Sequence, residues 1–186
     1  NSYYQMVRKD ISEYFGTARI RCIIEGTEDD LWICTYSAEM GIVHMDSSGK
    51  LTAITVDDGL PDNSVRCAVI AEDGSLLVGT NGGMAIIRND KVVGTVTSDD
   101  GIENTIFLTV ESDSEGNLYA GTDGDGIYVI KGDKIEHIGR DDGLSSDVIL
   151  RIKRDNARNV LWIITSNSIQ FLWNGTVHTV TSFPYN

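Results

Sequence analysis

The chain has 186 residues, with 15 Lys and Arg against 28 Asp and Glu, and a formal net charge of -13 at pH 7. An acidic surface repels phosphate backbones and anionic lipids, so binding to nucleic acid or to a membrane surface is disfavoured. No run of about 18 apolar residues occurs, so no part of this sequence is expected to insert into a membrane. G-x-S-x-G, HExxH and phosphate-binding Gly-loop motifs are also missing from the sequence, and we expect no cofactor.

The first 16 residues differ from the rest of the chain. Their apolar residues follow three- and four-residue spacings, at Tyr3, Met6, Val7, Ile11, Tyr14 and Phe15. This pattern predicts an amphipathic helix over residues 1–16, with Gly16 near its C-terminal end. We expect the helix to cap an exposed face of the structure that follows, or to belong to an upstream element.

Two landmarks then recur along the chain with a common period. Asp-Asp-Gly-Leu occurs at 57–60 and 141–144, with Asp-Asp-Gly-Ile between them at 99–102, so the spacing is 42 residues both times. An apolar run that ends in Thr recurs at 31–35, 76–80, 118–122 and 161–165. Because two independent landmarks keep one period, the sequence predicts four tandem repeats. We place them at 17–60, 61–102, 103–144 and 145–186.

Each repeat contains the pattern of four short strands. In the second, alternating or β-branched runs at 65–71, 76–80, 84–88 and 91–97 are separated by Asp, Asn and Gly turns. Four strands in 40–45 residues is the size of a propeller blade. The sequence therefore predicts an all-β fold, a β-propeller fragment of four blades with four antiparallel strands each, preceded by the short helix.

The three cysteines are interpreted as core residues. Alternation along the first strand of each repeat places Cys22 and Cys67 at the position that Leu108 and Leu150 fill in the later repeats. Cys34 lies at the second-strand position of Gly79, Gly121 and Ile164. The odd number of cysteines and the lack of a CxxC pair argue against a disulfide framework or a zinc site.

The two ends of the repeat array bear on assembly. Residues 182–186 come where a further blade would begin, and the Asp-Asp-Gly-Leu signal is missing there. We expect the natural protein to continue on both sides, which would leave two apolar blade faces uncovered in this fragment and favour self-association.

Trp32 and Trp162 occupy equivalent second-strand positions and are predicted to lie in blade interfaces.

The repeats resemble a known family. Residues 59–65, Gly-Leu-Pro-Asp-Asn-Ser-Val, and residues 72–83, which include Gly-Ser-Leu-Leu-Val-Gly-Thr-Asn-Gly-Gly, are similar to the two-component regulator propeller repeat. The third repeat matches at 101–104 and 115–122, and the first and fourth keep Leu-Trp-Ile. The resemblance covers residues 18–181. It is weakest at an insertion at 36–40 in the first repeat and around Thr165, where the fourth repeat lacks the expected glycines.

This resemblance implies a function. Members of the family are extracytoplasmic sensor regions, periplasmic or on the cell surface, of bacterial membrane-anchored proteins whose output is a histidine kinase or a diguanylate cyclase. It implies a sensor segment that is not itself catalytic. Two alternatives remain open. One is a propeller enzyme acting on glycans, which needs convergent carboxylates or a His–carboxylate pair. The other is a structural propeller for dimerisation or docking.

Candidate ligand-binding residues lie in two sets of loops, those between the second and third strands and those leading to the next repeat, which open on one face of a propeller. They are Tyr36, Asp62, Asn63, Asn81, Asn104, Asp123, Asp125, Asp147 and Asn167. Such an acidic, amide-rich rim suits a small molecule such as a glycan, or a cationic ligand. The alternative is that these residues serve turn geometry alone.

No metal or catalytic residue is predicted. Asp123-Gly124-Asp125-Gly126 has the look of a calcium loop, but the twelfth position is Lys134 where an EF-hand loop requires Glu. The three histidines, His44, His137 and His178, are expected on third or fourth strands away from the axis.

Overall fold

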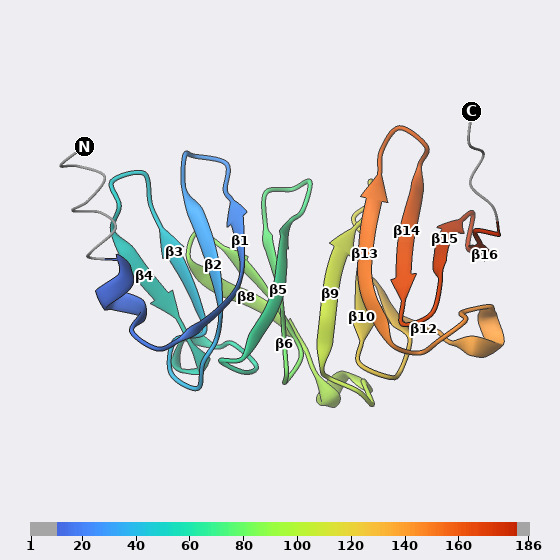
Figure 1. Cartoon of the computed structure of the whole chain (residues 1–186), viewed down its shortest axis with the longest axis horizontal. Coiled ribbons are helices and arrows are strands. Elements are labelled where there is room, and N and C mark those ends of the chain that lie inside the picture. The colour runs from blue at the N-terminus through green and yellow to red at the C-terminus, as the bar shows by residue number, and fades with distance from the viewer. Residues whose placement is uncertain (1–10, 182–186) are drawn as a thin grey trace.

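The computed structural model describes residues 11–181. Figure 1 shows four sheets side by side in chain order, with the first and fourth at opposite ends of the row. Each sheet has four antiparallel strands in sequential order. The four-bladed, all-β architecture predicted from the repeats is confirmed, and the strands of each blade fall within one predicted repeat.

The first two blades contain eight strands with the following bounds. Blade 1 consists of β1 (Arg19–Glu25), β2 (Leu31–Tyr36), β3 (Ile42–Met45) and β4 (Leu51–Ile54). Blade 2 consists of β5 (Val65–Ile70), β6 (Leu76–Thr80), β7 (Met84–Arg88) and β8 (Lys91–Val96).

The last two blades have the same order. Blade 3 consists of β9 (Phe107–Ser112), β10 (Leu118–Thr122), β11 (Ile127–Lys131) and β12 (Lys134–Ile138). Blade 4 consists of β13 (Ile149–Asp155), β14 (Val160–Thr165), β15 (Ile169–Trp173) and β16 (Thr176–Thr179). The inner strands β1, β5, β9 and β13 pack against one another in succession.

Part of the predicted N-terminal helix is described. Residues 11–15 are helical, and the N–H of Gly16, whose φ is +51°, donates to the carbonyl of Ser12 at 3.1 Å. Phe15 packs with Ile33 and Val43 on the face of blade 1 that points away from blade 2. The helix therefore caps this blade face, while residues 1–10 of the prediction lie outside the described residues.

Three apolar clusters hold neighbouring blades together. Alternate residues of each strand point to opposite faces of the sheet, so every blade contributes one set to the preceding interface and one to the next. Trp32, Cys34 and Ile42 face blade 2, Phe107 lies in the cluster of blades 2 and 3, and Ile149 lies in that of blades 3 and 4. Trp32 is buried in a blade interface, as predicted.

The Asp-Asp-Gly-Leu signal forms a capped turn at the start of each connection between blades. Short 3-10 helices occupy Val56–Asp58, Ser98–Asp100 and Arg140–Asp142. In the first, the carboxylate of Asp58 accepts from the backbone N–H of Thr55, Gly59 adopts a left-handed φ of +102°, and Leu60 is buried between blades. The second Asp of each signal thus caps the turn, so we do not count this Asp among the candidate ligand-binding residues.

A β-bulge at the same place in every inner strand corrects the predicted alignment of the cysteines. The register shifts between Val65 and Cys67 in β5 and between Ile149 and Arg151 in β13. Because one extra residue changes the face on which the next side chains lie, Cys22 and Cys67 correspond to Thr109 and Arg151. The predicted equivalence with Leu108 and Leu150 is wrong by one residue. Leu150, one of those predicted core positions, is 49% exposed.

The end face of blade 4 carries exposed apolar side chains. Trp162, which corresponds to the buried Trp32, lies here beside Phe171 with ring centroids 5.5 Å apart. Ile164, Ile169 and Trp173 on the same face are between 39% and 49% exposed. Nothing within the described residues covers this face as the helix covers that of blade 1.

Candidate functional site

A cluster of four side chains joins blades 1 and 2 at the loop-bearing end of their inner strands. Tyr36, at the end of β2, contacts two guanidinium groups: Cζ of Arg21 is 5.4 Å from its ring centroid and Cζ of Arg66 is 5.3 Å away. Nδ2 of Asn81 donates to the Tyr36 hydroxyl at 3.2 Å, and Nε of Arg66 donates to Oδ1 of Asn81 at 2.5 Å. We call Arg21, Tyr36, Arg66 and Asn81 the rim cluster.

The bulges and strand ends position this cluster. Arg21 and Arg66 are the extra residues of the bulges in β1 and β5, so they leave the regular alternation of their strands. Tyr36 pairs with Ser64 in an isolated bridge between blades 1 and 2. The carbonyl of Asn81 accepts from the hydroxyl of Thr105 at 3.0 Å, which ties the cluster to blade 3.

Three of the four inner strands, β1, β5 and β13, carry Arg or Lys although the whole chain is acidic. Their cations are Arg19 and Arg21 on β1, Arg66 on β5, and Arg151, Lys153 and Arg154 on β13. The pKa of Cys22 on β1 is lowered chiefly by a hydrogen bond from Cys34, and the charge of Arg151 on β13 adds to the effect. Guanidinium and amide donors suit hydroxyl and carboxylate oxygens better than a cationic ligand.

Four of the predicted rim residues stabilise loops. Oδ1 of Asp62 accepts from the N–H of Ser64 at 2.6 Å, and Asn63 joins two loops by accepting from the N–H of Val56 at 2.9 Å and donating to the carbonyl of Ala38 at 2.8 Å. Asn104 donates to the carbonyl of Asp123 at 3.0 Å. Asn167 accepts from the hydroxyl of Ser145 at 2.8 Å. Their side chains already have intramolecular partners.

Three further predicted residues lie in blade 3 and in its connection to blade 4. Asp123 is exposed, Asp125 accepts from the hydroxyl of Tyr128, and Asp147 forms an ion pair with Nε of Arg140 at 2.9 Å. Of the nine predicted residues, Tyr36 and Asn81 are the two that belong to the rim cluster. Sequence reasoning missed Arg21 and Arg66, although an Arg-Cys dipeptide recurs in the first strands of two repeats.

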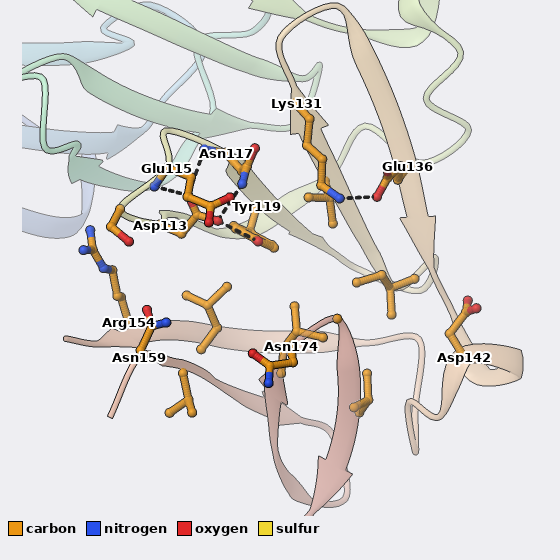
Figure 2. Close-up of a pocket in the computed structure, with 18 of the residues that line it drawn as sticks. Asp113, Glu115, Asn117, Tyr119, Lys131, Glu136, Asp142, Arg154, Asn159 and Asn174 are labelled. Carbon is orange, nitrogen blue, oxygen red and sulfur yellow. Dashed lines mark hydrogen bonds and ion pairs between the residues drawn. The ribbon is translucent and has the colours of Figure 1, made fainter. Parts of the chain in front are cut away.

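A second polar feature is a cleft between blades 3 and 4, which Figure 2 shows with its lining side chains. The cleft has a volume of about 520 Å³ and includes Asp113, Tyr119, Glu136 and Arg154. A similar cleft of about 590 Å³ lies between blades 2 and 3 and shares the turn at 113–115.

Side-chain size explains the cleft between blades 3 and 4. In blade 1, Trp32 and its cross-strand neighbour His44 stack at a centroid distance of 4.3 Å and an interplanar angle of 5°. Tyr119 and Val129 occupy the equivalent pair of positions in blade 3 but fill less of the space between blades. The cleft thus results from smaller side chains at equivalent positions of the repeat, and the polar turns next to it supply its lining.

The carboxylate of Asp113 is the most strongly hydrogen-bonded group in the cleft. Burial alone would raise the pKa of Asp113, but hydrogen bonds from Asn117 and from the hydroxyl of Tyr119 at 2.9 Å outweigh it and hold the pKa below its usual range. Burial and the same hydrogen bond raise the pKa of Tyr119 above its usual range. Asp113 is therefore ionised at neutral pH, and its oxygens are occupied by the turn (Figure 2).

The histidines lie on outer strands, as predicted: His44 on β3, His137 on β12 and His178 on β16. His44 bridges blades 1 and 2, with Nε2 at 2.9 Å from Asp30 and Nδ1 at 2.8 Å from Asp90. Among residues 11–181, no group of three or more His, Cys, Asp or Glu side chains is arranged to hold a metal ion. In the same part of the chain, no helix has the length and hydrophobicity that a membrane span requires.

Comparison with solved structures establishes the fold class. The extracellular domain of a protein described as a hybrid two-component system from B. thetaiotaomicron matches 88% of this chain with a TM-score of 0.73 and 21% identity. The fold is a β-propeller. A second such domain from the same organism matches 91% with a TM-score of 0.67 and 20% identity. Virginiamycin B lyase from Staphylococcus aureus matches 87% with a TM-score of 0.71 and 19% identity.

The chain spans only part of each of these propeller proteins, 23% and 22% of the two extracellular domains and 55% of the lyase. No family model matches the sequence, and no curated protein matches it significantly. The similarity therefore concerns the propeller fold, which is shared by extracellular domains of signalling proteins and by an enzyme.

Proposed function

We propose that this propeller segment is the ligand-sensing part of an extracytoplasmic region in a bacterial membrane-anchored signalling protein, and that it is not itself catalytic. The observation that carries the proposal is the rim cluster, in which side chains from two blades meet at the loop-bearing end of the propeller. The repeat motif and the fold that the chain shares with extracellular domains of two-component systems support the same assignment.

The cluster favours a ligand rich in hydroxyl or carboxylate oxygens, such as a glycan. Arg21 is exposed and Arg66 is half-buried, so both guanidinium groups reach solvent beside the ring of Tyr36. Planar guanidinium groups donate several hydrogen bonds in a fixed geometry, and the Asn81 amide, which is hydrogen-bonded to Arg66 and to Tyr36, holds these groups in position.

Signalling requires that the ligand prefer one conformation. Because Tyr36 belongs to blade 1, Asn81 to blade 2 and the partner of the Asn81 carbonyl to blade 3, a ligand on the rim cluster would contact groups whose relative positions depend on how the blades pack. A ligand that fits one packing better shifts the population towards it by its difference in affinity.

A thermal-shift screen of the chain against neutral glycans, uronate-containing glycans, amino acids and peptides tests the proposal. A ligand at 100 times its dissociation constant adds roughly 2.7 kcal/mol to the stability of the folded state, which raises the midpoint measurably. We expect one class to raise the midpoint of the native chain and to have no effect on Tyr36→Ala or Asn81→Ala. Asn167→Ala, in the corresponding loop of blade 4, is the matched control and should retain the shift.

Three results would count against the proposal. Absence of any shift across the panel would favour a docking or dimerisation propeller. A shift that survives both rim-cluster variants would place the ligand elsewhere, with the cleft of Figure 2 as the next candidate. Chemical conversion of the ligand during incubation, read by chromatography, would make the segment an enzyme.

A further inference from the structure

Two cysteines face each other in blade 1. Cys22 of β1 and Cys34 of β2 are direct partners in the register of the two strands. Cys22 packs against the apolar cluster that contains Cys34, and the interaction of the two thiols lowers the pKa of Cys22 and raises that of Cys34. Cys34 is fully buried, whereas Cys22 is partly exposed, so one thiol of the pair is accessible from outside.

The equivalent positions in blades 2 and 3 define the geometry of this pair. In blade 2 they hold Cys67 and Gly79, and a Cβ added to Gly79 would lie 2.6 Å from Sγ of Cys67. In blade 3 they hold Thr109 and Gly121, and a Cβ at Gly121 would lie 2.7 Å from Cγ2 of Thr109. The first-strand side chain therefore points at the Cβ position of the residue across from it.

A disulfide requires such an arrangement. With an S–S bond of about 2 Å and its usual angles, each sulfur lies about 3 Å from the Cβ of the opposite cysteine. Blades 2 and 3 have glycine at the second-strand position, while blade 1 has a cysteine at both positions. In blade 1, the first-strand side chain that points across to the second strand is Cys22, and the residue it points at is Cys34.

We propose that Cys22 and Cys34 form a reversible disulfide, a redox modification site that links β1 to β2 beside the rim cluster. Arg21 immediately precedes Cys22, and Tyr36 follows Cys34 by two residues, so the bond fixes the strands that carry half of that cluster. Cys67 has Gly79 opposite it and stays a thiol.

The two thiols differ in reactivity in the way that the reaction requires. The pKa of Cys22 falls to about 7, mainly because Cys34 donates a hydrogen bond to it, with Arg151 and Arg21 adding to the effect against the opposing influence of burial. The pKa of Cys34 is raised because its proton is shared with Cys22 and because Cys34 is buried. Burial raises the pKa of Cys67 to about 12. At neutral pH, Cys22 is therefore the nucleophile of the three.

The reaction uses a low-molecular-weight disulfide as its oxidant. The Cys22 thiolate attacks one sulfur of the oxidant, forms a mixed disulfide and releases the other half as a thiolate, which takes a proton from solvent. Cys34 then loses its proton to solvent and attacks the Cys22 sulfur, which releases the second thiol. The protein loses two protons and two electrons, and one oxidant molecule is reduced to two thiols.

Equilibration of the native chain with glutathione disulfide, followed by unfolding, alkylation of free thiols and intact-mass measurement, tests the proposal. We expect the number of alkylated cysteines to fall from three in the reduced protein to one. In Cys67→Ser it should fall from two to none. In Cys34→Ser, which has no second thiol at the site, a glutathione adduct should accumulate on Cys22.

Several results would overturn the proposal. Three alkylated cysteines after equilibration would show that the pair does not oxidise, and a disulfide that contains Cys67 would show that the register does not select the pair. A stable glutathione adduct on Cys22 in the unsubstituted chain would show that Cys34 cannot reach it. Circular dichroism of the oxidised chain before unfolding verifies that the bond forms in the folded protein.

Discussion

Gly79 offers a sharp test of how the blades pack. It lies in β6, where every residue is buried, at the interface of blades 2 and 3. An added Cβ would lie 2.6 Å from Sγ of Cys67 and 3.2 Å from both Cβ of Phe107 and Cγ1 of Val110. Because carbon atoms in a core are normally about 3.5–4.0 Å apart, Gly79→Ala forces three neighbours to move at once. Overpacking of this kind costs about 1–3 kcal/mol.

Gly94 provides a matched control in the same blade. It lies in β8, and an added Cβ would meet only Cδ1 of Ile86, at 3.7 Å, which is an ordinary contact. Neither glycine requires a left-handed backbone. Gly94→Ala should therefore leave stability unchanged or raise it by about 0.4–1 kcal/mol, because alanine restricts the unfolded chain.

Urea unfolding followed by circular dichroism measures both effects. With a slope of about 2 kcal/mol per M, a loss of about 2 kcal/mol lowers the midpoint for Gly79→Ala by about 1 M. Combining Gly79→Ala with Cys67→Ala removes the closest contact, and we expect part of the loss to be recovered, a coupling of about 0.5–2 kcal/mol. If Gly79→Ala were as stable as Gly94→Ala, the packing of blade 2 against blade 3 described above would be wrong.

Three further predictions concern other interfaces. The depressed pKa of Asp113 contributes stability that is present above about pH 4 and lost as pH falls through the pKa in the folded state, so Tyr119→Phe should reduce the acid dependence of the urea midpoint. Glu111 is buried and accepts a backbone hydrogen bond from β13, so Glu111→Ala should cost about 1–3 kcal/mol in the same assay. Trp32→Ala should cost about 3–5 kcal/mol, whereas Trp162→Ala, on an uncovered face, should cost less and reduce self-association in sedimentation velocity.

The repeats made most of the fold predictable. In the second repeat, strands predicted at 65–71, 76–80, 84–88 and 91–97 differ from the observed strands by no more than one residue at any end. Alternating apolar residues and Gly-containing turns recur in all four repeats. A strand that is ambiguous in one repeat can therefore be assigned from the equivalent residues of the others. The helix at 11–15 was predictable for a different reason, its three- and four-residue spacing.

The bulges were not predictable from alternation. A strand with strict period two would place Leu150 in the core, but Leu150 is itself the extra residue of the bulge in β13 and is exposed. The same device brings Arg21 and Arg66 to the ring of Tyr36. Pairing register depends on both strands and on the turn that joins them, so a single strand's pattern does not reveal where an extra residue is inserted.

The roles of the acidic loop residues were also hidden in the sequence. Asp58 and Asp62 occupy the same connection, yet Asp58 caps a 3-10 helix and Asp62 stabilises a turn through the N–H of Ser64. Both roles require only a short side chain that accepts a hydrogen bond, and a binding residue has the same composition. Tyr36 and Asn81 could be predicted to share a face, while their direct contact depends on how blade 1 packs on blade 2.

In blades 1 to 3, one second-strand residue lies opposite the first strand, at Cys34, Gly79 and Gly121. This residue is smaller where the next blade packs a larger side chain over it. Gly79 lies under Phe107, and Gly121 lies under Ile149. Cys34 shares its cluster with Val65, which is the smallest of these three inner-strand residues. Under Val65 there is room for a sulfur atom, whereas an added Cβ under Phe107 or Ile149 already collides. Packing therefore permits a cross-strand cysteine pair in blade 1 and excludes one in blades 2 and 3, next to the same strand ends that carry Tyr36.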